Sequence, residues 1–324
     1  MTTSLAAPRA EWINGNAYAI NEEDVEFPSC GTTLAGRFLR PEDGASSRPV
    51  LVMAPGMSGV KEGSIAQFSR FFAQGGFDVL AFDNINFGAS GGAPRQEVDP
   101  HLQREGYRDA ITYLALRGDV DAGRVGIWGT SFAGGNVLEV AARDRRVKCV
   151  VAQIPHISGS AVFRRRVQPL QRDKALRAQD ADREARFRGE APAMVKAVSD
   201  NPAEPVAMAG RPAWDYFTEQ ARQAPNWKNE LTLRSLDNSR GLENGVWLPL
   251  ISPTPLLMIV ALADELVPHD VALAAYETAL EPKKLVMLEG NHFSPYREDF
   301  EISSNMARDW FTRHLMTGGS AALL

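Results

Sequence analysis

A short apolar stretch, Arg124–Trp128, leads directly into Gly129-Thr-Ser131-Phe-Ala133 and then into an apolar helical run at 136–142. This pattern predicts that Ser131 lies at a sharp turn from a strand into a helix. Such a turn exposes the hydroxyl at the carboxyl edge of a sheet, and the small residues Gly129 and Ala133 let the two backbones approach each other. The usual motif ends in glycine where this chain has Ala133. Ser131 is therefore a candidate nucleophile, whereas the structural alternative is a small buried serine at a helix start.

Length and charge limit the classes of protein to consider. A chain of 324 residues is longer than one hydrophobic core usually reaches, so we expect one large domain with an insertion. The net charge of −5 gives no reason to expect a nucleic-acid partner. Cys30 and Cys149 lie far apart, and Cys149 is in an apolar run, so we expect neither a disulfide framework nor a metal cluster.

No targeting or membrane signal is apparent. Residues 1–9 lack a basic segment followed by an apolar one, and no run of about 18 apolar residues occurs. We therefore expect a cytoplasmic protein without a membrane span.

Short apolar runs alternate with helical patterns along most of the chain. The expected strands are 49–54, 77–82, 125–128, 147–153, 255–261 and 284–288, and the expected helices are 65–74, 102–116, 271–279 and 305–315. An antiparallel pair at 24–40, turned at Cys30 and Gly31, precedes them. The alternation predicts an α/β fold with a mostly parallel, doubly wound sheet.

The interval 156–250 interrupts this alternation, because strand-like runs are scarce there. We expect a core made of 1–155 and 251–324 and a mainly helical cap insertion at 156–250. The interval contains an arginine-rich run, for which a solvated helix face is favoured over anion binding: Arg164, Arg165, Arg166, Arg172, Arg177, Arg183, Arg186 and Arg188. It also contains aromatic residues, of which one or two are expected to line a pocket: Trp214, Tyr216, Phe217, Trp227 and Trp247.

A serine nucleophile needs a base to accept its proton and a carboxylate to orient that base. Asp264 and His292 each follow one of the last two predicted strands. The carboxyl ends of strands are where a doubly wound sheet gathers its functional groups. We therefore expect Ser131, Asp264 and His292 to form a catalytic triad, with Glu265 and Asp270 as less favourably placed alternatives for the acid.

The other histidines are weaker candidates for the base. His101 and His269 open predicted helices and His314 lies in the last helix, so none of them follows a strand. His156 follows the strand after Ser131 and is expected to contact substrate rather than to act as the base. The aromatic residues Trp214, Tyr216 and Phe217 are further candidate substrate contacts.

A tetrahedral oxyanion needs backbone donors. The amide of Phe132, directly after the nucleophile, is one expected donor. The other is the Met57 amide, in the glycine-containing loop 55–59 after the first parallel strand.

Two further motifs carry a family resemblance. The segment 53–62 (MAPGMSGVKE) is similar to an H-G-x-x-G-x-K-E loop in which Pro55 replaces histidine. The segment 82–91 (FDNINFGASG) is similar to D-x-R-x-F-G-x-S-x-G, with Ile85 in the arginine position. With the order Ser131, Asp264, His292, these motifs resemble the α/β-hydrolase superfamily over almost the whole chain.

Within that superfamily, 94–100, 253–255 and 290–296 resemble the dienelactone-hydrolase-like and polyketide transferase or thiohydrolase group. The resemblance implies action on esters or acyl thioesters, some members passing the acyl group to an alcohol instead of water.

We therefore expect a serine hydrolase that cleaves a carboxylic ester or acyl thioester through an acyl-enzyme on Ser131, with no cofactor and no metal. The alternatives are an acyltransferase that uses an alcohol acceptor, a C–C bond hydrolase, and a non-catalytic ligand-binding protein of the same fold. The expected partner is a small-molecule ester or thioester, without nucleic acid or a membrane span, and a homodimer is left open.

Overall fold

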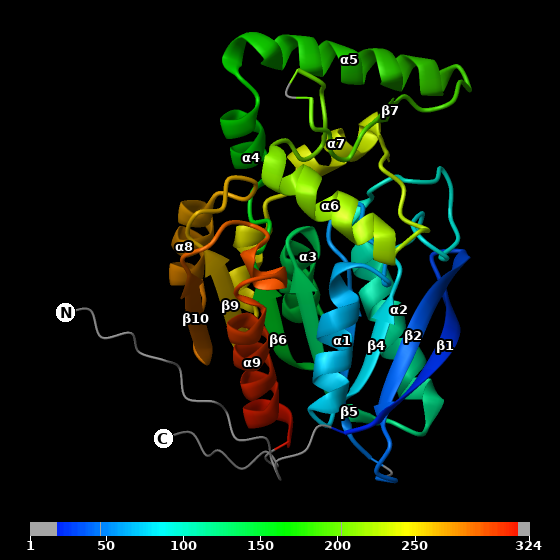
Figure 1. The fold of residues 1–324 in the computed structure, drawn as a ribbon, viewed down its shortest axis with the longest axis vertical. Helices are drawn as coiled ribbons and strands as arrows, with labels where there is room; N and C mark the ends of the chain where they lie inside the picture. Colours follow the sequence, from blue (N-terminus) through cyan, green and yellow to red (C-terminus); the bar gives the residue numbers. More distant parts are fainter. Residues whose placement is uncertain (1–17, 46, 202, 317–324) are drawn as a thin grey trace, which may run out of the picture.

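A computed structural model describes residues 18–45, 47–201 and 203–316, so the interpretation of residues 1–9 lies outside the described part of the chain. An eight-stranded sheet in the order β1-β2-β4-β3-β5-β6-β9-β10 forms the centre of the molecule (Figure 1). The strands are β1 (Ile20–Ser29), β2 (Thr32–Pro41), β3 (Pro49–Ala54), β4 (Asp78–Phe82), β5 (Asp121–Thr130), β6 (Val147–Gln153), β9 (Leu256–Ala261) and β10 (Lys283–Leu288).

The strand directions agree with the sequence. β2 pairs antiparallel with both β1 and β4, and the remaining pairs are parallel. The β1–β2 turn lies at Cys30 and Gly31, whose positive φ angles of 48° and 77° allow a two-residue connection. The expected α/β fold with a mostly parallel sheet is confirmed.

Helices cover both faces of this sheet. The helices α2 (Pro100–Arg117), α3 (Phe132–Arg143) and α8 (His269–Thr278) pack on one face, and α1 (Ser64–Gln74) and α9 (Phe300–Phe311) pack on the other. In β3, Val50 and Val52 belong to the first core and Leu51 and Met53 to the second. Because both faces are buried at the centre of the sheet, β3 and β9 are continuous apolar runs, whereas the edge strand β10 is partly exposed.

Local sequence accounts for the helix ends. Asp99 caps α2 by accepting the N–H groups of His101 and Leu102, and Gly118 ends it in the left-handed conformation. α9 begins at Phe300 rather than near residue 305, because the Phe300 ring packs against Phe68 of α1 with centroids 4.8 Å apart. The sequence pattern does not indicate this early start, because the residues around Phe300 are polar.

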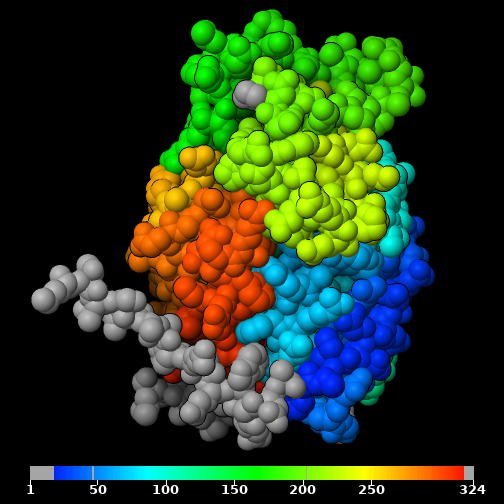
Figure 2. Space-filling view, viewed as in Figure 1, coloured from blue at the N-terminus to red at the C-terminus, as the bar shows by residue number. Residues whose placement is uncertain are grey.

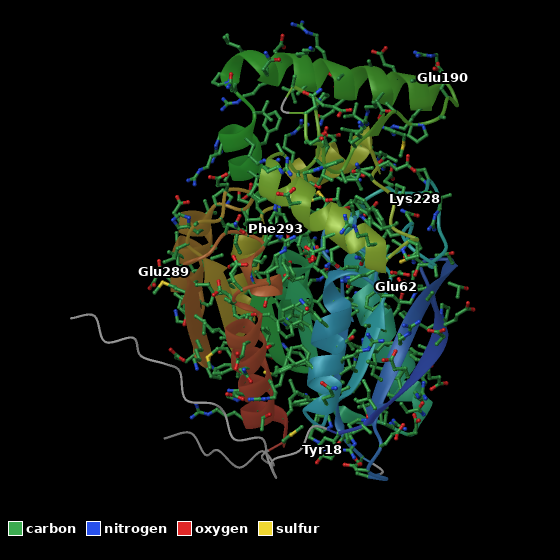
Figure 3. All side chains as sticks on the ribbon, in the orientation of Figure 1. Tyr18, Glu62, Glu190, Lys228, Glu289 and Phe293 are labelled. Atoms are coloured by element: carbon green, nitrogen blue, oxygen red, sulfur yellow. The ribbon has the colours of Figure 1, made fainter. Side chains whose placement is uncertain are left out.

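Most of the chain between β6 and β9 lies over the carboxyl ends of the parallel strands (Figures 1 and 2), and its last part, before β9, packs against α3 and α8. Its elements are α4 (Gly159–Arg166), α5 (Pro169–Phe187), β7 (Met194–Val195), α6 (Arg211–Gln223), β8 (Leu231–Thr232), α7 (Leu233–Arg240) and the 3-10 helix η1 (Asn244–Leu250). Phe293 and Glu62 lie near the boundary between this segment and the sheet (Figure 3). Within the described ranges, no helix is both long and apolar enough to cross a membrane.

Candidate active site

Ser131 lies at the turn between β5 and α3. Its φ of 56° and ψ of −118° are strained for a residue with a side chain, and such strain is a common property of functional positions. A Cβ on Gly129 would lie 2.3 Å from the carbonyl oxygen of Ala133, so the residue before the turn must be glycine. A Cβ on Gly135 would likewise lie 2.3 Å from the carbonyl oxygen of His156. The start of α3 therefore approaches the chain leaving β6 closely enough to hold the Ser131 turn in place.

The structure brings together the three side chains predicted as a triad. His292 Nε2 lies 3.0 Å from Ser131 Oγ, and His292 Nδ1 lies 2.6 Å from Asp264 Oδ2. The other carboxylate oxygen of Asp264 accepts the backbone N–H groups of Leu266 and Val267, each at 2.8 Å. These bonds fix the carboxylate, which in turn fixes the ring of His292 with Nε2 toward the serine.

The alternative acids lie elsewhere. Glu265 is exposed, and Asp270 is exposed and pairs with Arg165 of α4. Among the other histidines, His101 is exposed at the start of α2, and His314 packs its ring against Trp310 with centroids 4.2 Å apart. Geometry thus singles out Asp264 and His292 as the partners of Ser131.

The loop after β3 faces the serine turn. A Cβ on Gly56 would lie 3.3 Å from Ser131 Cβ and 3.5 Å from Phe132 N, so glycine allows this loop to approach the turn. Asn84 Nδ2 donates to Pro55 O at 2.9 Å and holds the loop from the end of β4. The N–H of Phe132 is the first of helix α3, where amides have no acceptor within the helix. Backbone donors at Met57 and Phe132 thus lie on the two segments that meet at Ser131.

Ile85, at the position where the motif has arginine, is 5% exposed and belongs to the core shared with α2 and α3. Arg95 instead contacts this loop, because its guanidinium donates to the carbonyls of Ser90 and, at 2.7 Å, Gly88.

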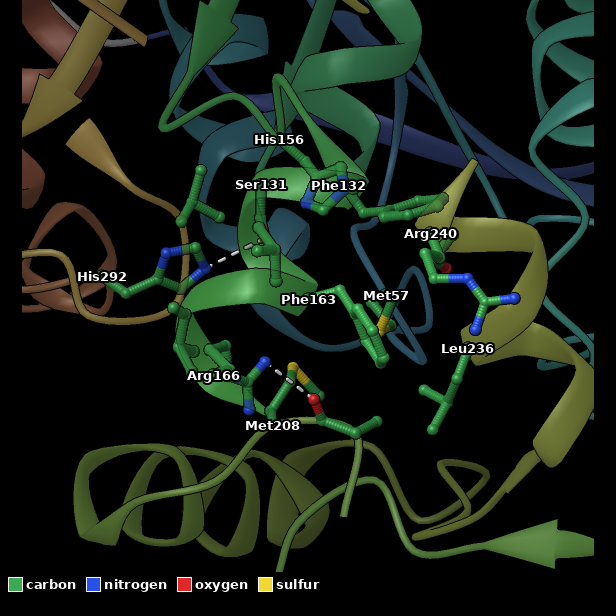
Figure 4. A pocket seen from close by; sticks show the side chains of 16 residues that line it. Met57, Ser131, Phe132, His156, Phe163, Arg166, Met208, Leu236, Arg240 and His292 are labelled. Atoms are coloured by element: carbon green, nitrogen blue, oxygen red, sulfur yellow. Dashed lines mark hydrogen bonds between the residues drawn. The ribbon is translucent and has the colours of Figure 1, made fainter. Parts of the chain in front are cut away.

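Two cavities meet at Ser131. The larger, of about 100 Å³, is lined by Ser131 and His292 and by Phe163, Met208 and Leu236 of the 156–250 segment (Figure 4). Arg166 and Arg240 also line it, and none of its described lining residues is Asp or Glu.

The smaller cavity, of about 30 Å³, lies under α6. Tyr216 and Phe217 line it together with Phe293 and Tyr296, and Tyr216 stacks on Phe293 with centroids 4.7 Å apart. Ser131 borders both cavities, as do Met57, Met208 and His292. The nucleophile can therefore face two substrate portions at once.

The residues predicted to contact substrate lie at different cavities. His156 lines the larger cavity, whereas Tyr216 and Phe217 line the smaller one. Trp214 is not among the described residues lining either cavity; it packs, like Tyr216 and Phe217, against the core on the α1 side. Sequence reasoning missed Phe163 and Met208; Phe163 and Arg166 are three apart on α4, a spacing that places them on one helix face.

His156 is a buried imidazole beside the nucleophile. Its Nε2 has no hydrogen-bond partner among the described residues, and its ring lies against Phe132 with centroids 5.3 Å apart. Burial, with help from the nearby positive charge of Arg166, lowers the pKa of His156 to about 4. The ring is therefore neutral near pH 7. Within the described ranges, no group of three or more His, Cys, Asp or Glu side chains is placed to hold a metal ion.

Comparison with known proteins supplies the family. Residues 31–294 match the family described as X-Pro dipeptidyl-peptidase (S15 family). The chain belongs to this family. The chain is 32% identical to Thiohydrolase aneE from Aspergillus aculeatus, over 84% of this chain and 88% of the relative. It is 30% identical to Polyketide transferase claH from Penicillium crustosum, over 85% of this chain and 91% of the relative.

Solved structures agree with the family assignment. The alpha/beta hydrolase GrgF from Penicillium sp. sh18 superposes with a TM-score of 0.79 at 28% identity, covering 91% of this chain and 99% of the other. The hypothetical protein PA2218 from Pseudomonas aeruginosa superposes with a TM-score of 0.78 at 25% identity, covering 91% and 94%. This S15-family protein has the α/β-hydrolase fold, and it is a hydrolase of the ester and thioester type.

Proposed function

We propose that the chain is a serine hydrolase that cleaves a carboxylic ester or acyl thioester through an acyl-enzyme on Ser131. One observation carries the proposal: His292 bridges Ser131 Oγ at 3.0 Å and Asp264 Oδ2 at 2.6 Å at the carboxyl edge of the sheet. Relatives named thiohydrolase and polyketide transferase support this class of substrate.

The geometry defines the order of the steps. His292 Nε2 accepts the proton of Ser131 as Oγ attacks the acyl carbon, and Asp264 stabilises the imidazolium that forms. The amides of Met57 and Phe132 donate to the oxyanion, and removing one such donor costs roughly 10² to 10³ in rate. His292 then gives its proton to the departing alkoxide or thiolate. A water activated by the same imidazole releases the acid and restores Ser131.

Acyl transfer to an alcohol is the second candidate. Its support is the pair of cavities that meet at Ser131, since one can hold the acyl chain while the other holds a leaving group or an acceptor. Exclusion of water from the second cavity would favour the acceptor. The same triad could also cleave a C–C bond. A protein that only binds a ligand would not need the hydrogen-bonded arrangement of Ser131, His292 and Asp264.

The family description names a dipeptidyl-peptidase, whose substrates present a positively charged amino terminus. The larger cavity does not suit such a group, because Arg166 and Arg240 line it and none of its described lining residues is acidic. This charge favours neutral or anionic acyl groups over peptides.

The 156–250 segment acts in this proposal as a cap that selects substrates and contributes no triad member. It supplies Phe163, Met208 and Leu236 to one cavity and Tyr216 and Phe217 to the other, whereas Ser131, Asp264 and His292 all belong to the core. We place the enzyme in the cytoplasm, which the unpaired Cys30 and Cys149 support, and a homodimer would be recognised by sedimentation.

The test combines labelling with turnover. A fluorophosphonate probe should label the wild-type protein and leave Ser131→Ala unlabelled, which separates an enzyme from a binding protein. Hydrolysis of nitrophenyl esters and N-acetylcysteamine thioesters should fall by more than about 10³-fold in Ser131→Ala with an unchanged melting temperature. Added alcohol should raise ester formation only if transfer is the natural reaction. A folded Ser131→Ala variant that keeps more than about a tenth of the activity would exclude the proposal.

A further inference from the structure

Arg166, the last residue of α4, faces the larger cavity. It lines that cavity with Ser131 and His292, and one guanidinium nitrogen donates to the backbone carbonyl of Ala207 at 2.9 Å (Figure 4). No carboxylate among the described residues lies within ion-pair distance of its guanidinium. The sequence indicated that the arginines of this run were a solvated helix face, and Arg166 is a correction to that view.

The arginines around it are accounted for in other ways. Arg165 pairs with Asp270 at 2.5 Å on the surface, and the side chain of Arg164 is exposed. Arg240, which shares the cavity, pairs with Asp237 and lies over the Phe163 ring, 5.3 Å from its centroid. Arg166 differs because its guanidinium is directed toward the substrate site and, among the described residues, hydrogen-bonds only to the neutral carbonyl of Ala207.

A cation enclosed by protein without an anion is unfavourable. Burial lowers the pKa of Arg166 below its usual value, although the more distant carboxylate of Asp264 partly opposes the shift. Arginine stays charged in proteins, so the site keeps an uncompensated guanidinium until something anionic enters. The fork of donors on a guanidinium matches a carboxylate.

We propose that the acyl group of the natural substrate carries a carboxylate, which pairs with Arg166 while the ester or thioester carbonyl lies at Ser131. This inference rests on the proposed function. The apolar walls formed by Phe163, Met208 and Leu236 hold the carbon chain that joins the two ends. A cavity of about 100 Å³ has room for a short dicarboxylic acyl chain.

The experiment compares matched substrates. N-Acetylcysteamine monothioesters of succinic, glutaric and adipic acids are each assayed beside the same compound with its carboxylate capped as a methyl ester. The readout is the ratio of kcat/KM for the free acid to kcat/KM for the capped compound. In the wild type this ratio should exceed one for at least one chain length.

Two variants at Arg166 and one control separate charge from structure. Arg166→Gln keeps an N–H donor for Ala207 but removes the charge, and it should lower the ratio by about 10- to 100-fold. Arg166→Lys should restore part of the ratio. Arg164→Gln, on an exposed neighbour in the same helix, should leave the ratio and the activity unchanged.

The outcomes distinguish the inference from the proposed function. If the capped thioesters are hydrolysed but the ratio changes less than about threefold in folded Arg166→Gln, the inference is wrong and the hydrolase assignment stands. If Arg166→Gln instead weakens turnover of coenzyme A thioesters relative to N-acetylcysteamine thioesters of one neutral acid, the anion belongs to the leaving group and the inference is also wrong. If the wild type hydrolyses no thioester or ester and is not labelled, the proposed function fails and the inference fails with it.

Discussion

Asp83 binds both the backbone and the side chain of Lys61. One carboxylate oxygen accepts the Lys61 N–H at 2.7 Å, and the other accepts the Lys61 ammonium at 2.9 Å. Both side chains are almost fully buried, with exposures of 6% for Lys61 and 0% for Asp83. Burial alone would lower the pKa of Lys61, but the carboxylates of Asp83 and Glu62 outweigh it and raise that pKa. The pair joins the loop that carries Met57 to the end of β4.

The first prediction concerns this pair. Asp83→Asn leaves the Lys61 ammonium buried without its main counter-charge, so the free energy of unfolding should fall by about 3–5 kcal/mol. Because the same bond holds the loop of the Met57 amide, kcat should fall as well. Urea denaturation and ester hydrolysis at one pH measure the two effects.

The matched control is the double variant Lys61→Met, Asp83→Asn, which removes both charges. It should recover part of the lost stability, since the buried ammonium is gone and only the partly exposed carboxylate of Glu62 loses an ion pair. A single Asp83→Asn variant that loses less than about 1 kcal/mol would show that the pair does not hold the loop.

The second prediction tests the identity of the acid. Asp264→Asn presents an amide N–H to His292 Nδ1 and favours the wrong tautomer, so kcat should fall by about 10⁴-fold. The fold should survive, because the remaining amide oxygen can still accept from Leu266 and Val267. Glu265→Gln, at the exposed neighbouring position, should leave kcat within about twofold. The reverse result in nitrophenyl ester assays would assign the acid to Glu265.

Much of this arrangement could be predicted from the sequence, because both faces are buried at the centre of the sheet and β3 and β9 are therefore continuous apolar runs. Asp264 and His292 could be identified because each follows a short apolar strand, the buried β9 for Asp264 and the partly exposed edge strand β10 for His292. The direction of Arg166 could not be predicted, since α4 is short and mostly polar and its orientation is set by packing against α7. All three aromatic residues of α6 pack against the core on the α1 side, and of these Tyr216 and Phe217 also line the smaller cavity.

The third prediction uses the low pKa of His156. The folded state holds this pKa at about 4, against 6.5 for an ordinary histidine, so the unfolded chain binds a proton between these values and the folded chain does not. The contribution of the neutral His156 ring to the free energy of unfolding is fully present above pH 6.5 and is lost as the pH falls toward 4. The loss attributable to His156 is roughly 3 kcal/mol over that window.

His156→Gln removes this titration. The difference in free energy of unfolding between pH 7 and pH 4.5, measured with urea, should be smaller in His156→Gln than in the wild type. His101→Gln, at an exposed histidine, is the control and should keep the wild-type difference. Equal pH dependence in His156→Gln and the wild type would mean that His156 titrates normally in the folded protein.

The fourth prediction assigns acyl-chain selection to the 156–250 segment. Phe163 lines the larger cavity beside Ser131, so Phe163→Ala should enlarge the space that the acyl chain occupies. One methylene in an apolar pocket changes discrimination by roughly 1–3 kcal/mol. The preferred nitrophenyl ester should therefore lengthen, with kcat/KM for longer chains rising about tenfold or more relative to acetate.

Acetate hydrolysis itself should persist in Phe163→Ala, because Ser131, His292 and the oxyanion donors all lie on the core. Trp247→Ala is the matched control: Trp247 lies in η1 and is not among the described residues that line either cavity, so its removal should leave the chain-length profile unchanged. An unchanged profile in soluble, folded Phe163→Ala would mean that the larger cavity does not receive the acyl chain. A profile altered equally by both variants would mean that the substitutions act through loosening of the whole segment, because Trp247 has no surface in the cavity through which it could select a substrate.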